Sequence, residues 1–235
     1  MQKKIDLVNG PVLSSLTRLA VPIMATSLIQ MAYNMTDMIW IGRIGSSAVA
    51  SVGAAGMYMW LSNGLAALAK MGGQVNVGHA LGASNSEEAA EYASNALQLT
   101  LTLGIIYGLV CILGAKPLIH FFHLNQLQVI QDAIHYLQIT CGLVLFSFLN
   151  QTFTGLFTAI GNSRPVFLAT TTGLIVNIIL DPVFIFGLKM GVVGAGIATV
   201  IGEMAAGILC LLYLRRLQSV QLEKAALRPT WPVLK

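Results

Sequence analysis

The amino-acid sequence predicts an all-α integral membrane protein with six transmembrane helices. Hydrophobic residues make up 56% of the 235 residues and charged residues only 9%, whereas about a quarter of the residues in an ordinary soluble domain are charged. The mean hydropathy is +0.76. A soluble chain of this length would need far more charge to cover its surface. The composition therefore excludes an ordinary soluble globular protein.

The chain divides into six apolar segments separated by short polar breaks. A helix that crosses a bilayer needs about 20 mostly apolar residues. The breaks "GRIGSS", "GASNSEE", "GNSRP" and "GLKMGVVG" are rich in Gly, Ser or Asn, as turns are. The segment between the third and fourth spans, which contains Pro117, fits a short helix at the membrane interface. We predict spans at residues 14–41, 48–70, 92–115, 133–159, 165–186 and 194–214, which together form a transmembrane lobe over residues 1–217.

The basic residues predict that both termini are cytoplasmic, because Lys and Arg concentrate on that side of a membrane. Residues 218–235 then form a cytoplasmic linker or tail, and the basic amino terminus precedes a retained first span rather than a cleaved leader. No basic stripe indicates a nucleic-acid partner. In this orientation only Arg43, Lys116 and Lys189 face outward, while Lys3, Lys4, Arg18, Arg164, Arg215, Arg216, Lys224, Arg228 and Lys235 face the cytoplasm.

Three carboxylates, Asp37, Asp181 and Glu203, lie inside predicted spans, where ionisable groups are costly and usually mark a functional path. At a rise of about 1.5 Å per residue, Asp37, Asp181 and Thr199 all lie roughly 6 to 8 Å below the outer interface. Helix spacing adds Asn177 to the face of Asp181, and it adds Tyr33 to the face of Asp37. These residues are therefore expected to share one pocket.

The oxygen atoms of this set suit a hard monovalent cation such as sodium, and carboxylates removed from water and close together could carry a proton instead. Pro182 has no N–H for the carbonyl of Ile178, which leaves a further free oxygen if the helix continues. The alternative reading is structural. In that reading Asp181 with Pro182 ends a helix, and Asp37 extends to the interface.

Other polar positions in the spans allow two interpretations each. Pro22 permits a kink in the first span, which is either a static bend or a moving hinge. Glu203 is either an inner proton relay or a carboxylate paired at a helix contact. The polar face of the fourth span either lines a solvent or substrate path or bonds to a neighbouring helix; its members are Ser147, Asn150, Gln151, Thr154 and Thr158.

The segments "YNMTDMIWIGRIG", "LGASNSEEA", "GNSRP", "NIILDPVFIFG" and "GVVGAGIATVIG" occur in this order and together resemble the multidrug and toxic compound extrusion (MATE) transporters over residues 10–217. That family exports cationic or amphiphilic compounds in exchange for sodium or protons. Its fold has two six-helix lobes. The resemblance implies an amino-terminal lobe, no organic cofactor, a bend at Pro22 and a cation site at Asp37, Asn177, Asp181 and Thr199.

The resemblance also implies partners and a location. A complete transporter of this family needs a second six-helix lobe, supplied by the same chain or another, besides the lipid bilayer and a small-molecule substrate. Two copies of a six-span chain would insert in the same orientation. A bacterial cell membrane is the expected location. The alternatives are a fragment or scaffold that does not transport, a flippase for lipid-linked precursors, and an intramembrane aspartyl protease, whose usual motifs this chain lacks.

Overall fold

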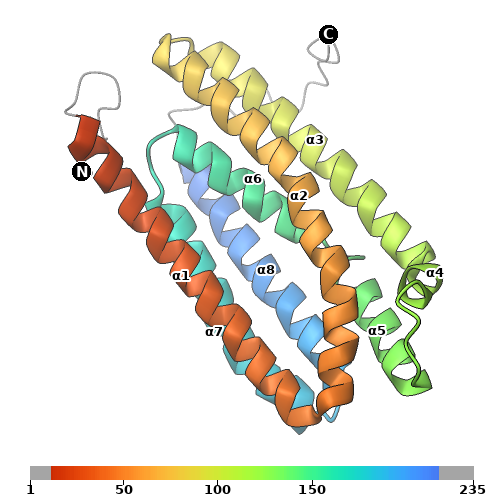
Figure 1. Ribbon diagram of the computed structural model, residues 1–235. Helices are drawn as coiled ribbons and strands as arrows, with labels where there is room; N and C mark the ends of the chain where they lie inside the picture. The colour runs from red at the N-terminus through yellow and green to blue at the C-terminus, as the bar shows by residue number, and fades with distance from the viewer. Residues whose placement is uncertain (1–11, 217–235) are drawn as a thin grey trace.

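The computed structural model describes residues 12–216 of the chain, and within this range the fold is all-α without a strand. The prediction of an all-α membrane lobe is confirmed. The predicted linker at 218–235 and the basic residues beyond 12–216 lie outside the described residues. The helices, labelled in Figure 1, are α1 (Val12–Ile44), α2 (Ser46–Gly82), α3 (Ser86–Leu113), α4 (Ala115–His120), α5 (Leu127–Thr140), α6 (Leu145–Ala159), α7 (Arg164–Pro182), the π-helical segment η1 (Val183–Gly187) and α8 (Gly191–Arg216).

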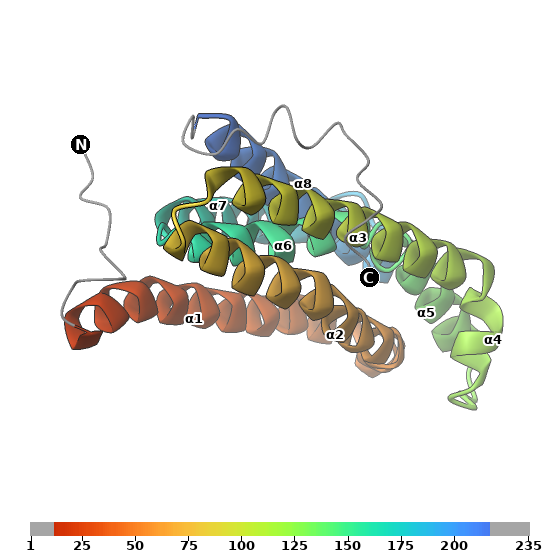
Figure 2. The same cartoon turned by 90° about the horizontal axis from the view of Figure 1, so that it is seen from above.

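The long helices pack side by side as one bundle. Helix α8 lies between α5, α6 and α7, while α1 packs along α7 and α2 packs along α3 and α6. Figures 1 and 2 both show α1 and α3 on the outside of this arrangement. The bundle therefore brings the carboxyl-terminal part of α1 beside the end of α7, although these segments are far apart in the sequence. In the predicted orientation this is the outer end of the bundle.

Three helices of the described residues are long and apolar enough to cross a membrane: Ser86–Leu113, Arg164–Gly187 and Gly191–Leu214. The number of such candidate spans rises to four if the bent pair α5 and α6 counts as one span. Helices α1 and α2 have 33 and 37 residues. At about 1.5 Å per residue, each exceeds the roughly 30 Å of a bilayer core, although neither is among the helices that meet this test within the described residues. The count of six spans stays a prediction.

The fourth predicted span, 133–159, is not one continuous helix. It begins earlier, at Leu127, and breaks between Thr140 and Leu145 with a bend of 46°. Helix α3 approaches this break closely, because a Cβ at Gly108 would lie only 2.8 Å from the carbonyl oxygen of Gly142. The two glycines lack side chains, so the broken turn and α3 can pack backbone to backbone.

The fifth predicted span continues through Pro182 into the π-helical turn η1. The N–H of Leu188 donates to the carbonyl of Val183 at 2.8 Å, which is a five-residue step. Single π turns are common at functional sites, since they change the direction of nearby side chains. Here the turn follows Asp181 directly. The helix expected between the third and fourth spans is present as the short α4.

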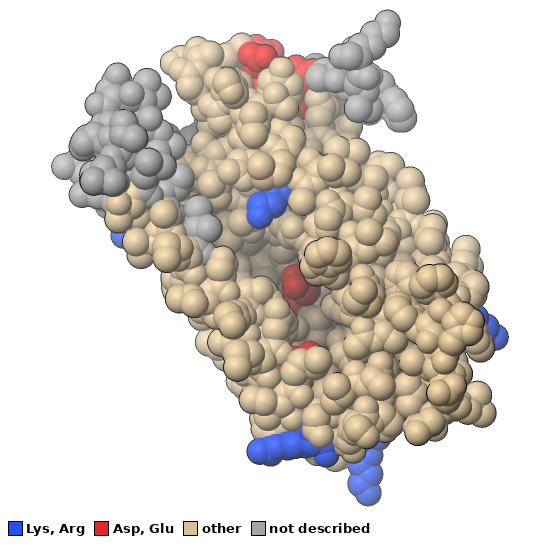
Figure 3. All heavy atoms as spheres, viewed as in Figure 1, with Lys and Arg blue, Asp and Glu red and all other residues tan. Residues whose placement is uncertain are grey.

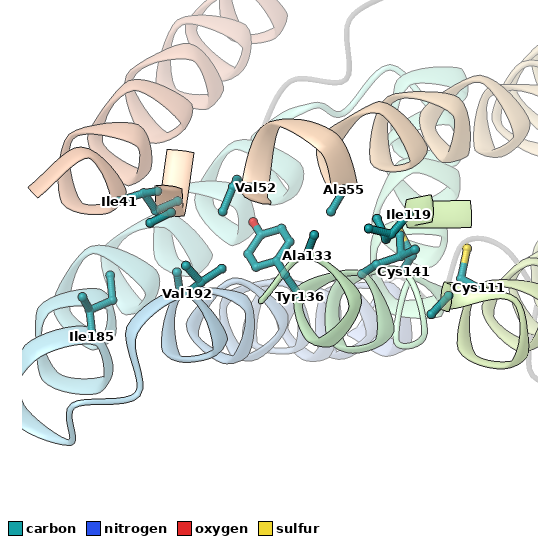
Figure 4. Packing of buried hydrophobic residues seen from close by; sticks show 14 residues of the cluster. Ile41, Val52, Ala55, Cys111, Ile119, Ala133, Tyr136, Cys141, Ile185 and Val192 are labelled. Atoms are coloured by element: carbon teal, nitrogen blue, oxygen red, sulfur yellow. The ribbon is translucent and has the colours of Figure 1, made fainter. Parts of the chain in front are cut away.

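A buried apolar cluster joins the outer ends of the helices. Figure 4 shows Ile41 of α1, Ile185 of η1, Val192 of α8 and Tyr136 of α5 around this core, with Val52 of α2 beside the Tyr136 ring. Burying such side chains is the main stabilising contribution to packing. The cluster therefore fixes the outer ends of α1, α5 and α8 relative to η1.

Candidate functional site

Close backbone packing of α7 on α8 positions the predicted polar cluster. A Cβ at Gly173 would lie 2.6 Å from the carbonyl oxygen of Gly202, and a Cβ at Gly202 would lie 2.8 Å from that of Gly173. Both distances are shorter than real Cβ contacts allow, so only glycine fits. Asn177 lies one turn further along α7, and Thr199 lies nearly one turn back along α8. The two glycines therefore hold these polar residues at a tight helix contact.

At this level one hydrogen bond connects α1 to α8, and two others lie within α8 and within α7. The Tyr33 hydroxyl donates to Thr199 Oγ1 at 3.2 Å, which joins α1 to α8. The Thr199 hydroxyl in turn donates to the carbonyl of Ala195 at 3.0 Å. On α7, the Asn177 amide donates to Asp181 Oδ1 at 3.4 Å. Four of the predicted residues thus lie in two short chains of hydrogen bonds.

Several oxygen atoms of the cluster have no hydrogen-bond partner among the described residues. They are Asp37 Oδ1, Asn177 Oδ1 and Asp181 Oδ2, and all three are buried. Asp181 is 0% exposed and Asn177 is 1% exposed. A buried acceptor without a donor costs about 1 to 3 kcal/mol, and more when it is charged. Asp37 and Asp181 also lie within electrostatic range of each other.

This donor set fits a hard cation. Carboxylate, amide and hydroxyl oxygens are the ligands that such ions prefer. Within residues 12–216 no group of three or more His, Cys, Asp or Glu side chains gathers as a transition-metal site would require. A cation bound among Asp37, Asn177, Asp181 and Thr199 would satisfy the unpaired oxygens and offset the repulsion between the two carboxylates.

Tyr136 of α5 is a neighbour of the cluster that the sequence analysis did not identify. It is 2% exposed and lies within electrostatic range of Tyr33, Asp37 and Asp181. The available signal in the sequence was helical spacing. Tyr136 is four residues after Asp132 and four before Thr140, so the three polar residues lie on one helix face. A lone tyrosine near the start of a predicted span instead resembles an interfacial anchor.

Aromatic side chains cover the outer side of the cluster. Trp40 follows Asp37 by nearly one turn, and its ring makes an edge contact with Phe186 of η1 at a centroid distance of 6.1 Å. The guanidinium carbon of Arg43 lies 4.9 Å from the Trp40 ring centroid. Ile41, beside Trp40, is completely buried. The outer ends of α1 and η1 are thereby joined above the carboxylates.

A cavity of about 370 Å³ lies on the inner side of the cluster, between α1, α2, α6, α7 and α8. Figure 3 shows a hollow on this face with acidic atoms inside it and basic atoms at its edge. The cluster contributes Tyr33, Asn177 and Thr199 to the wall, whereas Asp37 and Asp181 are not part of the lining. Other polar lining residues are Gln30, Asn34, Asn63, Lys70, Ser147, Asn150, Gln151, Thr154, Thr170 and Glu203.

The polar face of α6 both lines this cavity and bonds to its neighbours. The Asn150 amide donates to the carbonyl of Glu203 at 2.8 Å and also to its carboxylate. The Gln151 amide donates to Asn63 Oδ1 at 2.8 Å, and the Thr154 hydroxyl donates to the carbonyl of Asn150. The contacts with α8 and α2 agree with the helix-contact alternative for this face, while its role as a solvent or substrate path stays a prediction.

Pro22 lies within α1, which continues through it from Val12 to Ile44. Its predicted role as a hinge stays a prediction.

A helical bundle with long apolar helices, a polar cavity and a buried oxygen cluster indicates a multi-pass membrane protein. The MatE family profile matches residues 22–183. The chain belongs to the MatE family, which confirms the resemblance seen in the sequence.

Relatives and solved structures agree with this assignment. The chain is 30% identical over 222 residues to the probable multidrug resistance protein NorM of Thermotoga maritima, covering 92% of this chain and 47% of that protein. It is 25% identical to the FAD transporter of Shewanella oneidensis, covering 100% of this chain and 53% of the relative. A MOP superfamily transporter from Pyrococcus furiosus superposes with a TM-score of 0.91 at 26% identity, covering 100% and 52%. The chain thus spans about half the length of the proteins it matches.

Proposed function

We propose that this chain is the amino-terminal lobe of a cation-coupled antiporter that exports cationic or amphiphilic compounds. The coupling ion, sodium or a proton, binds at Asp37, Asn177, Asp181 and Thr199. The observation that supports this most strongly is the group of three buried oxygens without hydrogen-bond partners in the described residues. Their unmet bonding capacity is what a bound cation or proton would satisfy.

The contacts around the cluster suggest how ion binding changes the cavity. Asp37 belongs to α1 and Asp181 to α7, so a cation between them draws the two helices together. Tyr33 and Thr199 transmit that movement, because they join α1 to α8 and also line the cavity. In this mechanism α1 bends at Pro22, the cavity wall is reshaped and the compound is released outward.

A second six-helix lobe, from the same chain or another, is proposed to complete the cavity. The matched relatives are about twice as long as the part that this chain covers. In the proposed arrangement both termini face the cytoplasm and the protein resides in the cell membrane. A flippase for anionic lipid-linked precursors is less well supported, because Lys70 is the only basic residue in the cavity lining among the side chains that the structure describes.

The relatives do not fix the substrate, because they include a multidrug resistance protein and an FAD transporter. The substrate class must therefore be inferred from this chain's own cavity.

Cellular efflux tests the proposal. Cells that express the chain together with a second lobe should accumulate less of a fluorescent organic cation, and dissipating the ion gradient should abolish that effect. Asp37→Asn and Asp181→Asn should each remove the coupled efflux. Glu87→Gln is the matched control, because it removes one carboxylate charge at an exposed position outside the cavity. Efflux that persists in both aspartate variants would refute the assignment.

A further inference from the structure

Glu203 is a carboxylate that the coupling cluster does not use. It follows Thr199 by four residues on α8 and so lies one turn, about 6 Å, further from the outer side. It is the only carboxylate in the cavity lining among the described residues, since Asp37 and Asp181 are absent from that wall. The cavity therefore has a negative group of its own.

Asn150 fixes the position of this carboxylate. Its amide donates both to the backbone carbonyl of Glu203 and to Oε2 of the side chain. Gly207, one turn along α8, lets Asn150 approach closely, because a Cβ there would lie 3.2 Å from Asn150 Oδ1. A carboxylate already held in one orientation binds a ligand with a smaller loss of conformational entropy.

The pair still has acceptor capacity to offer. Asn150 Oδ1 is buried and has no hydrogen-bond partner in residues 12–216. The bond from Asn150 engages Glu203 Oε2 and leaves Oε1 for a second donor. Lys70 lines the same cavity, but no ion pair between it and Glu203 occurs in the described part of the chain. Glu203 Oε1 can therefore receive a positively charged group, whereas the buried Asn150 Oδ1 lies against Gly207.

The rest of the cavity selects the size and character of that ligand. Its volume of about 370 Å³ falls in the range of about 300 to 1,000 Å³ that is typical of organic-ligand sites. Ile29, Met59 and Leu174 add apolar walls. A bare metal ion would leave these apolar walls without a contact. An organic cation with an apolar body would contact both the walls and the Glu203 carboxylate.

We propose that Glu203, held by Asn150, binds the positive charge of an organic cation in this cavity, at a site separate from the Asp37–Asp181 coupling cluster. The proposal rests on the proposed function only in identifying this ligand with the exported compound. Binding itself can be measured on the chain without transport.

The test is equilibrium binding of tetraphenylphosphonium to the full chain purified in detergent. Glu203→Gln should weaken binding about tenfold, since a charged partner is replaced by a neutral one of the same shape. Glu203→Asp keeps the charge and should restore part of the affinity. Triphenylphosphine oxide, a neutral probe with similar rings, should bind equally to the wild type and Glu203→Gln. Glu87→Gln should match the wild type for both probes.

The outcomes separate the two proposals. Equal tetraphenylphosphonium affinity in the wild type and Glu203→Gln, or no binding to the wild type, would overturn the Glu203 site. An equal loss for the neutral probe would also overturn it, because that result indicates a change of cavity shape rather than of charge. Intact Glu203-dependent binding together with unchanged ion coupling in Asp181→Asn would instead reject the proposed coupling site alone. Each variant is first checked for wild-type elution and thermal unfolding in detergent.

Discussion

The outer cluster and the inner cavity wall both contain carboxylates, but the two surroundings differ. Asp181 is completely buried, and one of its oxygens lacks a donor among the described residues. Glu203 is only partly buried, lines an open cavity and accepts a hydrogen bond from Asn150. A small ion or proton suits the first environment, and a larger organic cation suits the second.

This difference shows how one helix can serve two ligands. Thr199 and Glu203 lie one turn apart on α8, and Tyr33 of α1 lies within electrostatic range of Asp37, Asp181 and Glu203. An ion bound at the outer cluster can therefore influence an organic cation bound in the inner cavity, although the two share no coordinating atom. Such coupling requires differential binding to two conformations, rather than distance alone.

The largest expected effect comes from separating α7 and α8. Gly173→Val places a side chain against the carbonyl of Gly202, where even a Cβ would lie 2.6 Å away. Overpacking of this kind costs about 1 to 3 kcal/mol or more. We expect early thermal unfolding and loss of both sodium and tetraphenylphosphonium binding.

Gly64→Ala is the matched control for this change, because a Cβ at Gly64 would meet no atom within 4 Å. It should leave both binding activities and the unfolding temperature near those of the wild type. If Gly173→Val behaves in the same way as Gly64→Ala, the close helix contact is not required.

The second prediction separates the two carboxylate environments. Asp181→Asn should abolish ion-dependent efflux yet change tetraphenylphosphonium affinity by less than about threefold, because Asp181 does not line the cavity. Glu203→Gln should give the reverse pattern in the binding assays. Measuring the binding of both ligands to both variants checks this prediction. If either variant loses both the ion and tetraphenylphosphonium, the two proposed sites are one site.

A smaller effect is expected for the link between α1 and α8. Tyr33→Phe removes the hydroxyl that donates to Thr199 but keeps the ring. Loss of one such bond costs about 0.5 to 1.5 kcal/mol, so ion affinity should fall by a few-fold. Coupling between ion and organic-cation binding should weaken further, which titrating one ligand at fixed concentrations of the other would reveal. Wild-type coupling would show that the bond does not transmit the signal.

The smallest effect concerns the aromatic cover. Arg43→Gln removes the cation–π contact with Trp40 and keeps the edge contact of Trp40 with Phe186. At an exposed position such a contact contributes about 0.5 to 1 kcal/mol. We expect a slightly lower unfolding temperature and unchanged ion affinity in detergent. A marked fall in ion affinity would show that Arg43 acts on the cluster directly.

The sequence predicted the helices and the cluster because both depend on strong local signals. Polar residues such as Asp37 and Asp181 stand out in apolar helices, and spacing assigns Asn177 and Tyr33 to their faces. The sixth span also carries small residues at every fourth position, which favours the close packing of α7 on α8; they are Gly194, Ala198, Gly202 and Ala206.

The features that sequence did not reveal depend on tertiary contacts. The break near Gly142 leaves the apolar composition unchanged, and it lies where Gly108 of α3 approaches closely. Tyr136 joins the cluster only because that broken helix packs against α8. The bond between Asn150 and Glu203 joins residues 53 positions apart, so the pattern within either helix could not predict it.

The most direct test of the central claim is a calorimetric sodium titration of the purified chain in lightly buffered detergent solution at alkaline pH, with released protons recorded in parallel. A saturable signal is expected, which Asp181→Asn removes and Glu203→Gln retains. The same signal in Asp181→Asn, or no cation uptake of either kind by the wild type, would contradict the assignment of the outer cluster as the coupling site.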